Sequence, residues 1–170
     1  MLQIYCGNGK GKTTASVGSA VRAAGAGLKT AFIQFLKDGT SSEIAMLKKL
    51  PGMIVLYTTA CDKFTFLMND EEKEEVRRRH DQLLSQAESL LSEGLDVLIL
   101  DEFNAAYKLG LMNKETALQL ILSNKNRAEI IITGREPAPE FTEAADYISE
   151  ISAVKHPYEH GISARKGIEY

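Results

Sequence analysis

The stretch Tyr5–Ser16 reads YCGNGKGKTTAS and places three glycines and two lysines between an apolar segment and a helical pattern. The apolar segment, Leu2–Cys6, is typical of a strand, and the residues from Thr13 to Ala24 have helical periodicity. Glycines let consecutive backbone N–H groups point at one anion, and a helix N-terminus adds partial positive charge. The stretch therefore predicts a phosphate-binding loop, or P-loop, between a strand and a helix.

Two residues of this loop have distinct expected roles. Lys12 adds a full positive charge for the phosphates, and the Thr13 hydroxyl is expected on a magnesium ion. The usual pattern has glycine where this chain has Cys6, which we interpret as a small buried hydrophobic residue. The alternative interpretation of the stretch is a glycine-rich turn that carries a solvated lysine.

Strand-like and helix-like segments alternate along the rest of the chain. Apolar runs of strand length lie at 2–6, 30–36, 53–58, 97–100, 129–133 and 146–151. Helical patterns lie at 13–24, 42–50, 70–92, 113–123 and 139–145. This alternation predicts an α/β fold of the P-loop NTPase type, in which helices cover both faces of a mostly parallel six-stranded sheet. We expect residues 1–170 to form a single domain.

An acidic pair follows the fourth predicted strand, in the sequence VLILDE. Asp101 and Glu102 stand at the carboxyl end of this apolar run, where ligands bind in parallel sheets. From there they can reach the magnesium of the P-loop directly or through water. The alternative is an acidic pair that faces solvent. The residues alone therefore predict a magnesium–nucleotide site and no particular reaction.

The composition limits the partners of the protein. The 170 residues are 44% hydrophobic and 25% charged, and acidic residues outnumber basic ones by 23 to 20. No global positive field is present to attract nucleic acid or an anionic membrane. The cysteines, Cys6 and Cys61, lack metal-type spacing, and neither a signal peptide nor a membrane-length apolar run is found. We therefore expect a cytoplasmic protein without nucleic-acid or membrane partners.

Segments from the whole chain together resemble the P-loop class of ATP:corrinoid adenosyltransferases, also called cob(I)alamin adenosyltransferases. These segments are GNGKGKTTASVGSAVRAAGAG (7–27), IQFLKDG (33–39), LDE (100–102), IITGR (131–135) and AADYISEISAVKHPYEHGISARKGIEY (144–170). A P-loop is common to many ATPases, whereas the last two segments are far more discriminating.

The resemblance implies a group transfer in which the corrinoid is the nucleophile. In this family, a corrinoid reduced to Co(I) attacks the 5′ carbon of ATP, forms adenosylcobalamin or an adenosylated precursor, and expels triphosphate. The implied ligands are ATP as co-substrate, Mg²⁺ and the corrinoid substrate. An electron donor such as a reduced flavoprotein is also implied, and family members are often homodimers. No protein nucleophile is needed, which agrees with the lack of a defensible catalytic triad or dyad in the sequence.

The resemblance also assigns residues to the nucleotide. The residues implied to wrap the triphosphate are Asn8, Gly9, Lys10, Gly11, Lys12, Thr13 and Thr14. Lys12 would neutralise the triphosphate, while Thr13 and Glu102 serve the magnesium ion. Arg22 resembles a family arginine near the ribose and base, with a helix-surface arginine as the alternative. Arg135, after IITG, is expected near a phosphate or a carboxylate.

An aromatic pair is implied to act on the corrinoid. In family members, an aromatic-x-aromatic pair packs against the corrin and drives off its lower axial ligand, which makes the cobalt easier to reduce. Phe64 and Phe66 occupy these positions, and Phe66 departs from the commoner tryptophan. Phenylalanine retains an apolar plate but lacks the indole N–H. The alternative role for both residues is to anchor their loop to the core.

Two other classes of function remain open at this point. In an ATP-hydrolysing switch module, Glu102 would orient water against the γ-phosphate. In a non-catalytic carrier, the protein would bind and hand over finished adenosylcobalamin. The reaction products discriminate among these classes.

Overall fold

The computed structural model describes residues 1–58 and 67–169 of the chain. Within these residues, six strands form one sheet in the order β3-β2-β4-β5-β1-β6, and every neighbouring pair is parallel. The strands are β1 (Leu2–Cys6), β2 (Thr30–Gln34), β3 (Met53–Tyr57), β4 (Val97–Asp101), β5 (Glu129–Thr133) and β6 (Tyr147–Glu150). The predicted α/β architecture with six strands is confirmed, and the sheet is parallel throughout.

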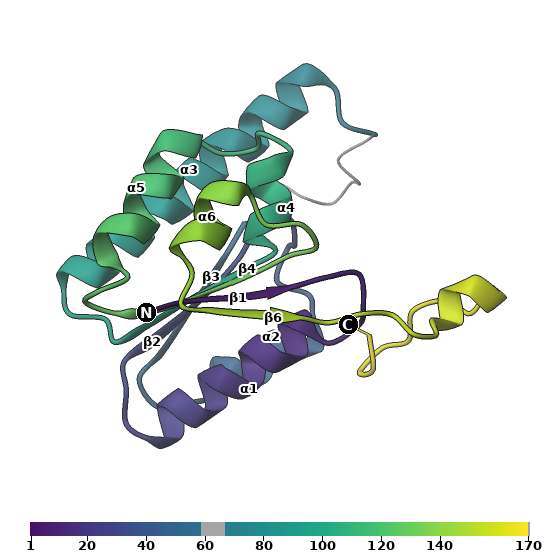
Figure 1. Cartoon of the computed structure of the whole chain (residues 1–170), viewed down its shortest axis with the longest axis horizontal. Coiled ribbons are helices and arrows are strands. Elements are labelled where there is room, and N and C mark those ends of the chain that lie inside the picture. Colours follow the sequence, from purple (N-terminus) through teal and green to yellow (C-terminus); the bar gives the residue numbers. More distant parts are fainter. Residues whose placement is uncertain (59–66, 170) are drawn as a thin grey trace.

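Helices cover both faces of this sheet, as predicted (Figure 1). One face packs against α1 (Lys12–Gly25) and α2 (Ser42–Leu47). The other face packs against α3 (Asp70–Ser92), α4 (Phe103–Lys108), α5 (Lys114–Asn124) and α6 (Pro139–Ala144). A short 3₁₀ helix, η2 (Pro157–His160), lies in the segment that follows β6.

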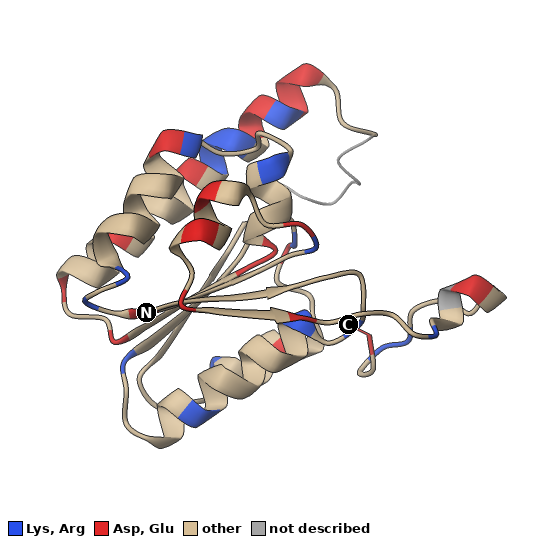
Figure 2. Cartoon of the chain, in the orientation of Figure 1, with Lys and Arg blue, Asp and Glu red and all other residues tan. Residues whose placement is uncertain are grey.

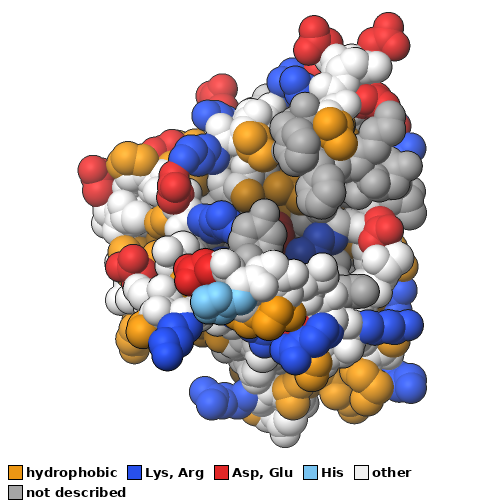
Figure 3. Space-filling view, turned by 90° about the vertical axis from the view of Figure 1, so that its right-hand side faces the viewer, with side chains coloured by type: hydrophobic (Ala, Val, Ile, Leu, Met, Phe, Trp, Pro, Cys, Tyr) orange, Lys and Arg blue, Asp and Glu red, His pale blue; other side chains and the backbone are white. Residues whose placement is uncertain are grey.

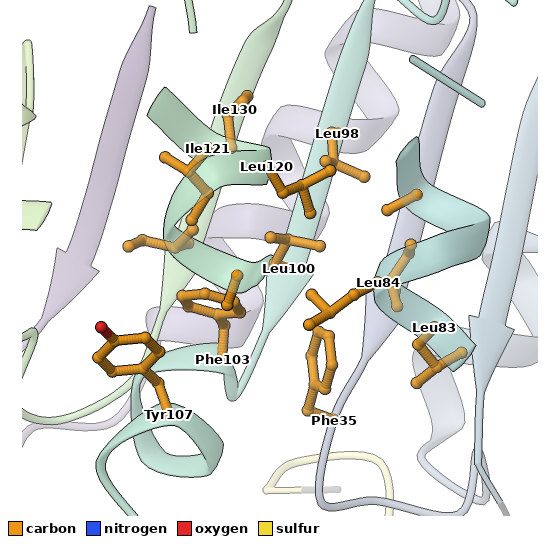
Figure 4. Close-up of a cluster of buried hydrophobic side chains, with 14 of the residues drawn as sticks. Phe35, Leu83, Leu84, Leu98, Leu100, Phe103, Tyr107, Leu120, Ile121 and Ile130 are labelled. Carbon is orange, nitrogen blue, oxygen red and sulfur yellow. The ribbon is translucent and has the colours of Figure 1, made fainter. Parts of the chain in front are cut away.

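Strand β4 illustrates how the sequence divides the core between the two faces. Val97 and Ile99 pack with the α1 and α2 side, whereas Leu98 and Leu100 pack with the α3 to α6 side. Successive side chains of a strand point to opposite faces, so a strand buried on both faces has to be apolar throughout. Figure 4 shows Leu98 and Leu100 on the face that meets Phe103 of α4 and Leu84 of α3.

Local signals set the start of the long helix α3. The Asn69 side chain accepts a hydrogen bond from the Glu72 backbone N–H, and the Glu72 carboxylate accepts one from the Asn69 backbone N–H. This reciprocal capping satisfies two N–H groups that would otherwise lack partners. Acidic residues in the first turn add a favourable interaction with the helix dipole, and basic residues follow them along the helix (Figure 2). The predicted bounds of this helix are confirmed.

Other boundaries differ from the prediction. The second strand ends at Gln34 instead of Leu36, because Leu36 has a positive φ of 56° and turns the chain away. Helix α2 ends at Leu47 instead of Leu50. Helix α4 was not predicted, since its short sequence FNAAYK has too few residues to display a helical period.

The carboxyl ends of the strands meet at one edge of the sheet, and the glycine-rich loop lies there between β1 and α1. Figure 3 views the molecule from this side, where Lys and Arg side chains lie in and around a central hollow. Among residues 1–58 and 67–169, no helix is both long and apolar enough to cross a membrane.

Candidate active site

The glycine-rich loop turns sharply between β1 and α1. Gly7 and Gly11 have φ values of 97° and 121°, a region that favours glycine. Gly11 immediately precedes α1, so the loop ends at the helix N-terminus, where unpaired N–H groups and the helix dipole favour an anion. The predicted order of strand, glycine-rich loop and helix is thus present.

Two glycines of this loop also permit close contact with the chain after β6. A Cβ atom at Gly7 would lie 2.4 Å from the Ile151 carbonyl oxygen, and one at Gly9 would lie 2.8 Å from the same atom. The Gly9 N–H donates a 2.7 Å hydrogen bond to that oxygen. The Asn8 side chain accepts a 2.9 Å hydrogen bond from the Ala153 backbone N–H. The loop is therefore held from behind by the segment that follows β6.

Asp101, at the end of β4, joins the start of α1 to the ends of β2 and β5. One carboxylate oxygen, Oδ1, accepts hydrogen bonds from the hydroxyls of Thr13 and Thr133, both at 2.8 Å. The other oxygen, Oδ2, accepts from Gln34 Nε2 at 3.1 Å and from Lys37 Nζ at 3.0 Å. Asp101 is fully buried, so these donors compensate for the hydration it has lost.

Glu102 stands beside Asp101 in an unusual backbone conformation. Its φ of 58° lies in the left-handed region, which is costly for a residue other than glycine and recurs at functional sites. Its backbone N–H donates a 3.0 Å hydrogen bond to the Thr133 hydroxyl, which holds this conformation. Burial raises the pKa of the Glu102 carboxyl above its usual range, although the nearby Lys37 ammonium opposes this change.

Three cationic side chains surround the acidic pair. Burial lowers the pKa of the Lys12 ammonium, which donates a 2.7 Å hydrogen bond to the Gly9 carbonyl oxygen. Burial by itself also lowers the pKa of Lys37, but the Asp101 and Glu102 carboxylates raise it above its ordinary value. Arg135 lies close enough to favour the charged form of Glu102, and its carbonyl oxygen accepts a hydrogen bond from the Gly7 N–H at 2.9 Å.

A cavity of about 280 Å³ opens beside the start of α1. Thr13, Thr14 and Lys37 line one part of it, and residues 41–43 line another. The end of the chain, at residues 167–169, forms the remaining wall. Phosphates that bind the N-terminus of α1 would enter this space, because the first helical N–H groups lie next to it.

Comparison with known proteins decides the family of this chain. A family model described as ATP:corrinoid adenosyltransferase BtuR/CobO/CobP matches residues 1–170. The chain belongs to this family. It is 32% identical over 171 residues to a corrinoid adenosyltransferase of Pseudomonas aeruginosa, covering 100% of this chain and 83% of that protein. A corrinoid adenosyltransferase of Escherichia coli (strain K12) is also 32% identical, with 100% and 85% covered.

A solved structure supports the fold. The cytoplasmic domain of EssC matches with a TM-score of 0.57 and 16% identity, covering 97% of this chain and 33% of that chain. At this identity the likeness concerns the fold alone, and the predicted P-loop NTPase-like fold is confirmed. Membership of the adenosyltransferase family also confirms the predicted enzyme class, with ATP and a corrinoid as the two substrates.

Most of the residues predicted to bind the nucleotide of this adenosyltransferase lie together at the carboxyl edge of the sheet. Thr13 and Thr14 line the cavity, and Lys12 is the first residue of α1, with its ammonium on the Gly9 carbonyl oxygen. Lys10 is exposed and lines a second cavity of about 280 Å³ beneath the chain after β6. Asn8 uses its side-chain oxygen to hold that same segment.

One residue predicted to lie near the ribose and base, Arg22, is distant from the loop. Arg22 lies in the last turn of α1, roughly 15 Å along the helix axis from Lys12 at 1.5 Å per residue, and it is exposed. In this chain Arg22 therefore lies on the surface of α1, as in the alternative interpretation of this residue. Phe64 and Phe66, the predicted corrinoid-facing pair, lie outside the described residues.

Sequence reasoning missed Lys37, Gln34 and Thr133 as partners of the acidic pair. Gln34 and Thr133 are the last residues of β2 and β5, and Lys37 follows β2 by three positions. The signal that could have identified them is a polar residue at the end of an apolar strand. The carboxyl ends of neighbouring parallel strands meet at one edge of the sheet, so such residues lie close together. Their convergence on Asp101 depended on the strand order, which the sequence did not supply.

Proposed function

We propose that this enzyme transfers the 5′-deoxyadenosyl group of ATP to the cobalt of a Co(I) corrinoid and releases triphosphate. The observation that carries the proposal is the 2.8 Å hydrogen bond from Thr13 to Asp101. It joins a phosphate-binding loop to an acidic strand end in a chain that the adenosyltransferase family model matches from residue 1 to 170. In this proposal the whole chain acts as a single domain.

The protein's task is to position the reactants and to stabilise the leaving group. The Co(I) electron pair forms the cobalt–carbon bond, and the electron pair of the broken C5′–O bond departs with triphosphate. No side chain has to become a nucleophile. The residues that would bind the triphosphate are Asn8, Gly9, Lys10, Gly11, Lys12, Thr13 and Thr14. Preorganised N–H groups and cations at such a position favour the charge that develops on the leaving oxygen.

The oxygen atoms at this site suit a magnesium ion. Thr13, Asp101 and Glu102 offer one hydroxyl and two carboxylates within a single cluster, and hard oxygen donors of this kind are preferred by Mg²⁺. We therefore propose that these three residues hold Mg²⁺, directly or through water, together with phosphate oxygens. The ion would neutralise part of the triphosphate charge, and Lys12 and Arg135 would neutralise more.

The corrinoid side of the reaction is proposed on the family resemblance. Phe64 and Phe66 would face the corrin and favour loss of its lower axial ligand. An external donor such as a reduced flavoprotein would supply the electron, and a homodimer is the proposed assembly. Because Co(I) is rapidly oxidised, a reducing compartment such as the cytoplasm is the proposed setting.

The deciding experiment is an anaerobic incubation of the enzyme with Mg²⁺, ATP and chemically reduced cobalamin. Light-sensitive alkylcobalamin should form in equal amount with triphosphate. ADP and phosphate with an unchanged corrinoid would instead indicate an ATP-hydrolysing switch. A single stoichiometric burst without turnover would indicate a carrier, so either result would contradict the proposal.

Lys12→Ala should lower the transfer rate by about 100-fold or more, because the leaving triphosphate loses its nearest full positive charge. The matched control is Lys29→Ala, since Lys29 is exposed and precedes β2 at the opposite edge of the sheet. Equal rates for both variants would contradict the role assigned to Lys12.

A further inference from the structure

Lys37 lies where a cation is needed between two carboxylates. Its Nζ atom is 3.0 Å from Asp101 Oδ2 and 3.7 Å from Glu102 Oε1. The Asp101 side chain is fully buried, and those of Lys37 and Glu102 are about 30% exposed, at 31% and 30%. Two adjacent carboxylates with little access to water repel each other strongly unless a positive charge compensates them. The Lys37 ammonium supplies that charge.

The backbone that carries Lys37 is held firmly. The Phe35 N–H donates a 2.9 Å hydrogen bond to the Asp101 carbonyl oxygen, which continues the pairing of β2 with β4. Leu36 has a φ of 56°, and its N–H points at Nε2 of the buried His80 at 3.4 Å. The position of the Lys37 Cα is therefore fixed by its neighbours, and the flexible four-carbon stem determines where the ammonium lies.

Lys37 also lines the cavity at the N-terminus of α1. Thr13 and Thr14 line the same space, so Lys37 contacts the acidic pair and also borders the proposed phosphate site. A rotation of this side chain would carry the ammonium from the carboxylates towards the phosphates. The carboxylates and the phosphates both offer negative charge to the ammonium. Only at the carboxylates does the ammonium compete with a divalent cation.

We propose that Lys37 is an internal counter-ion that occupies the cation position of the nucleotide-free enzyme and moves to the triphosphate when Mg²⁺ and ATP bind. Before binding, the ammonium keeps Asp101 and Glu102 compensated and disfavours a divalent cation alone. After binding, the same charge stabilises the leaving triphosphate. The second half of this proposal rests on the proposed transfer reaction, whereas the first half rests only on the proposed metal site.

The first test uses Mn²⁺ as a probe of the metal site without nucleotide. Removing the ammonium in Lys37→Met should tighten Mn²⁺ binding by about tenfold or more, because a repulsive charge a few ångströms from the metal is lost. Free Mn²⁺ would be followed by electron paramagnetic resonance during titration. A merely structural role for Lys37 predicts equal or weaker binding in the variant, and that result would overturn the proposal.

Matched variants separate charge from packing. Lys37→Arg retains the positive charge and should bind Mn²⁺ as weakly as the wild type. Lys37→Gln retains a hydrogen-bond donor without charge and should behave like Lys37→Met, which keeps the test valid if the methionine variant does not fold. Lys48→Met is the control for loss of a lysine elsewhere, since the Lys48 ammonium contacts the Tyr57 hydroxyl at 2.9 Å and should leave Mn²⁺ affinity unchanged.

The second test measures adenosyl transfer with saturating Mg²⁺ and ATP. Lys37→Met should lower the maximal rate by about tenfold or more, with Lys37→Arg retaining more of the rate than Lys37→Gln. An unchanged maximal rate in Lys37→Met would overturn the movement to the triphosphate. If the wild type itself makes no alkylcobalamin, the proposed function fails, and the Mn²⁺ titration still decides the counter-ion role separately.

Discussion

At the scale of single residues, the site depends on how completely one buried carboxylate is satisfied. Asp101 accepts hydrogen bonds from Thr13, Thr133, Gln34 and Lys37. These donors come from the P-loop helix, the end of β5, the end of β2 and the turn after β2. Because donors reach both of its oxygens, this buried carboxylate holds its neighbours in place. Asp101 therefore orders the site in addition to any contribution to the metal.

Asp101→Asn should lower the transfer rate by about 100-fold and destabilise the protein by about 1–3 kcal/mol. The amide has one acceptor oxygen, so donors on its nitrogen side lose their acceptor. Transfer kinetics and urea unfolding measure the two effects. Asp96→Asn is the matched control at the other end of β4, where Asp96 accepts a 2.8 Å hydrogen bond from the Lys29 N–H. Equal transfer rates for both variants would contradict the ordering role of Asp101.

At the scale of elements, the P-loop is braced by the segment that follows the edge strand β6. This contact requires small residues in the loop, because the Ile151 carbonyl lies where side chains would project from Gly7 and Gly9. The glycines of a P-loop are commonly explained by the approach of phosphate. Here two of them also permit the approach of another stretch of backbone. Loop geometry and the path of the chain after β6 are thus coupled.

Gly9→Ala should destabilise the protein by about 1–3 kcal/mol, because the new methyl group meets backbone atoms at 2.8 Å and the segment at Ile151 has to move. ATP affinity should fall as well, since the loop loses its brace. Urea unfolding and nucleotide titration measure these changes. Gly18→Ala is the matched control, because a Cβ at Gly18 meets nothing within 4 Å.

Gly18 lies inside α1, so the control substitution should instead stabilise the protein by about 0.5–1 kcal/mol through helix propensity. If Gly9→Ala left the free energy of unfolding unchanged or raised it, the segment after β6 would move easily and its contact with the loop would be weak.

At the scale of the whole molecule, the buried His80 links α3 to two other parts of the fold. Its Nδ1–H donates a 2.8 Å hydrogen bond to the Leu111 carbonyl oxygen, and its ring packs edge-to-face with Phe35. Burial lowers the pKa of His80, although the Leu111 carbonyl and the Asp81 carboxylate oppose this effect. Because Nε2 faces the Leu36 N–H, the neutral ring fits this site and the charged ring does not.

Stability should therefore fall as the pH decreases below about 6.5, the ordinary pKa of histidine. Below this value the unfolded chain binds a proton that the folded protein resists, so the free energy of unfolding decreases. The pKa of Glu75 and that of Glu169 are about 2, because arginine hydrogen bonds favour their charged forms, and their contributions are lost only at lower pH. The relevant window therefore lies below about pH 6.5, the ordinary pKa of histidine.

His80→Asn retains a donor for Leu111 and removes the titrating ring, so its free energy of unfolding should change less across that window. Urea unfolding at several pH values measures the slope, and His160→Asn, at an exposed histidine, is the control. An unaltered slope in His80→Asn would assign the pH dependence to other groups.

The sequence by itself determined the elements whose signals are local. The bounds of β1, β5 and α3 agree with the prediction, because apolar runs of strand length and an Asn-to-Glu capping pattern need no distant partner. The glycine-rich loop was predicted for the same reason. The family could also be recognised from the sequence, since the segments that resemble it extend from residue 7 to residue 170.

Only the tertiary structure decided which residues meet. Thr13 and Asp101 are 88 positions apart, and Lys37 and Asp101 are 64 apart, yet each pair is hydrogen-bonded. These contacts depend on the strand order β3-β2-β4-β5-β1-β6, which places the end of β4 beside the ends of β2 and β5. Local patterns specify whether a segment is a strand, whereas neighbours in a sheet are selected by packing the whole chain. The contacts of Lys37 follow from that packing, whereas the distance of Arg22 from the loop follows from the length of α1 alone.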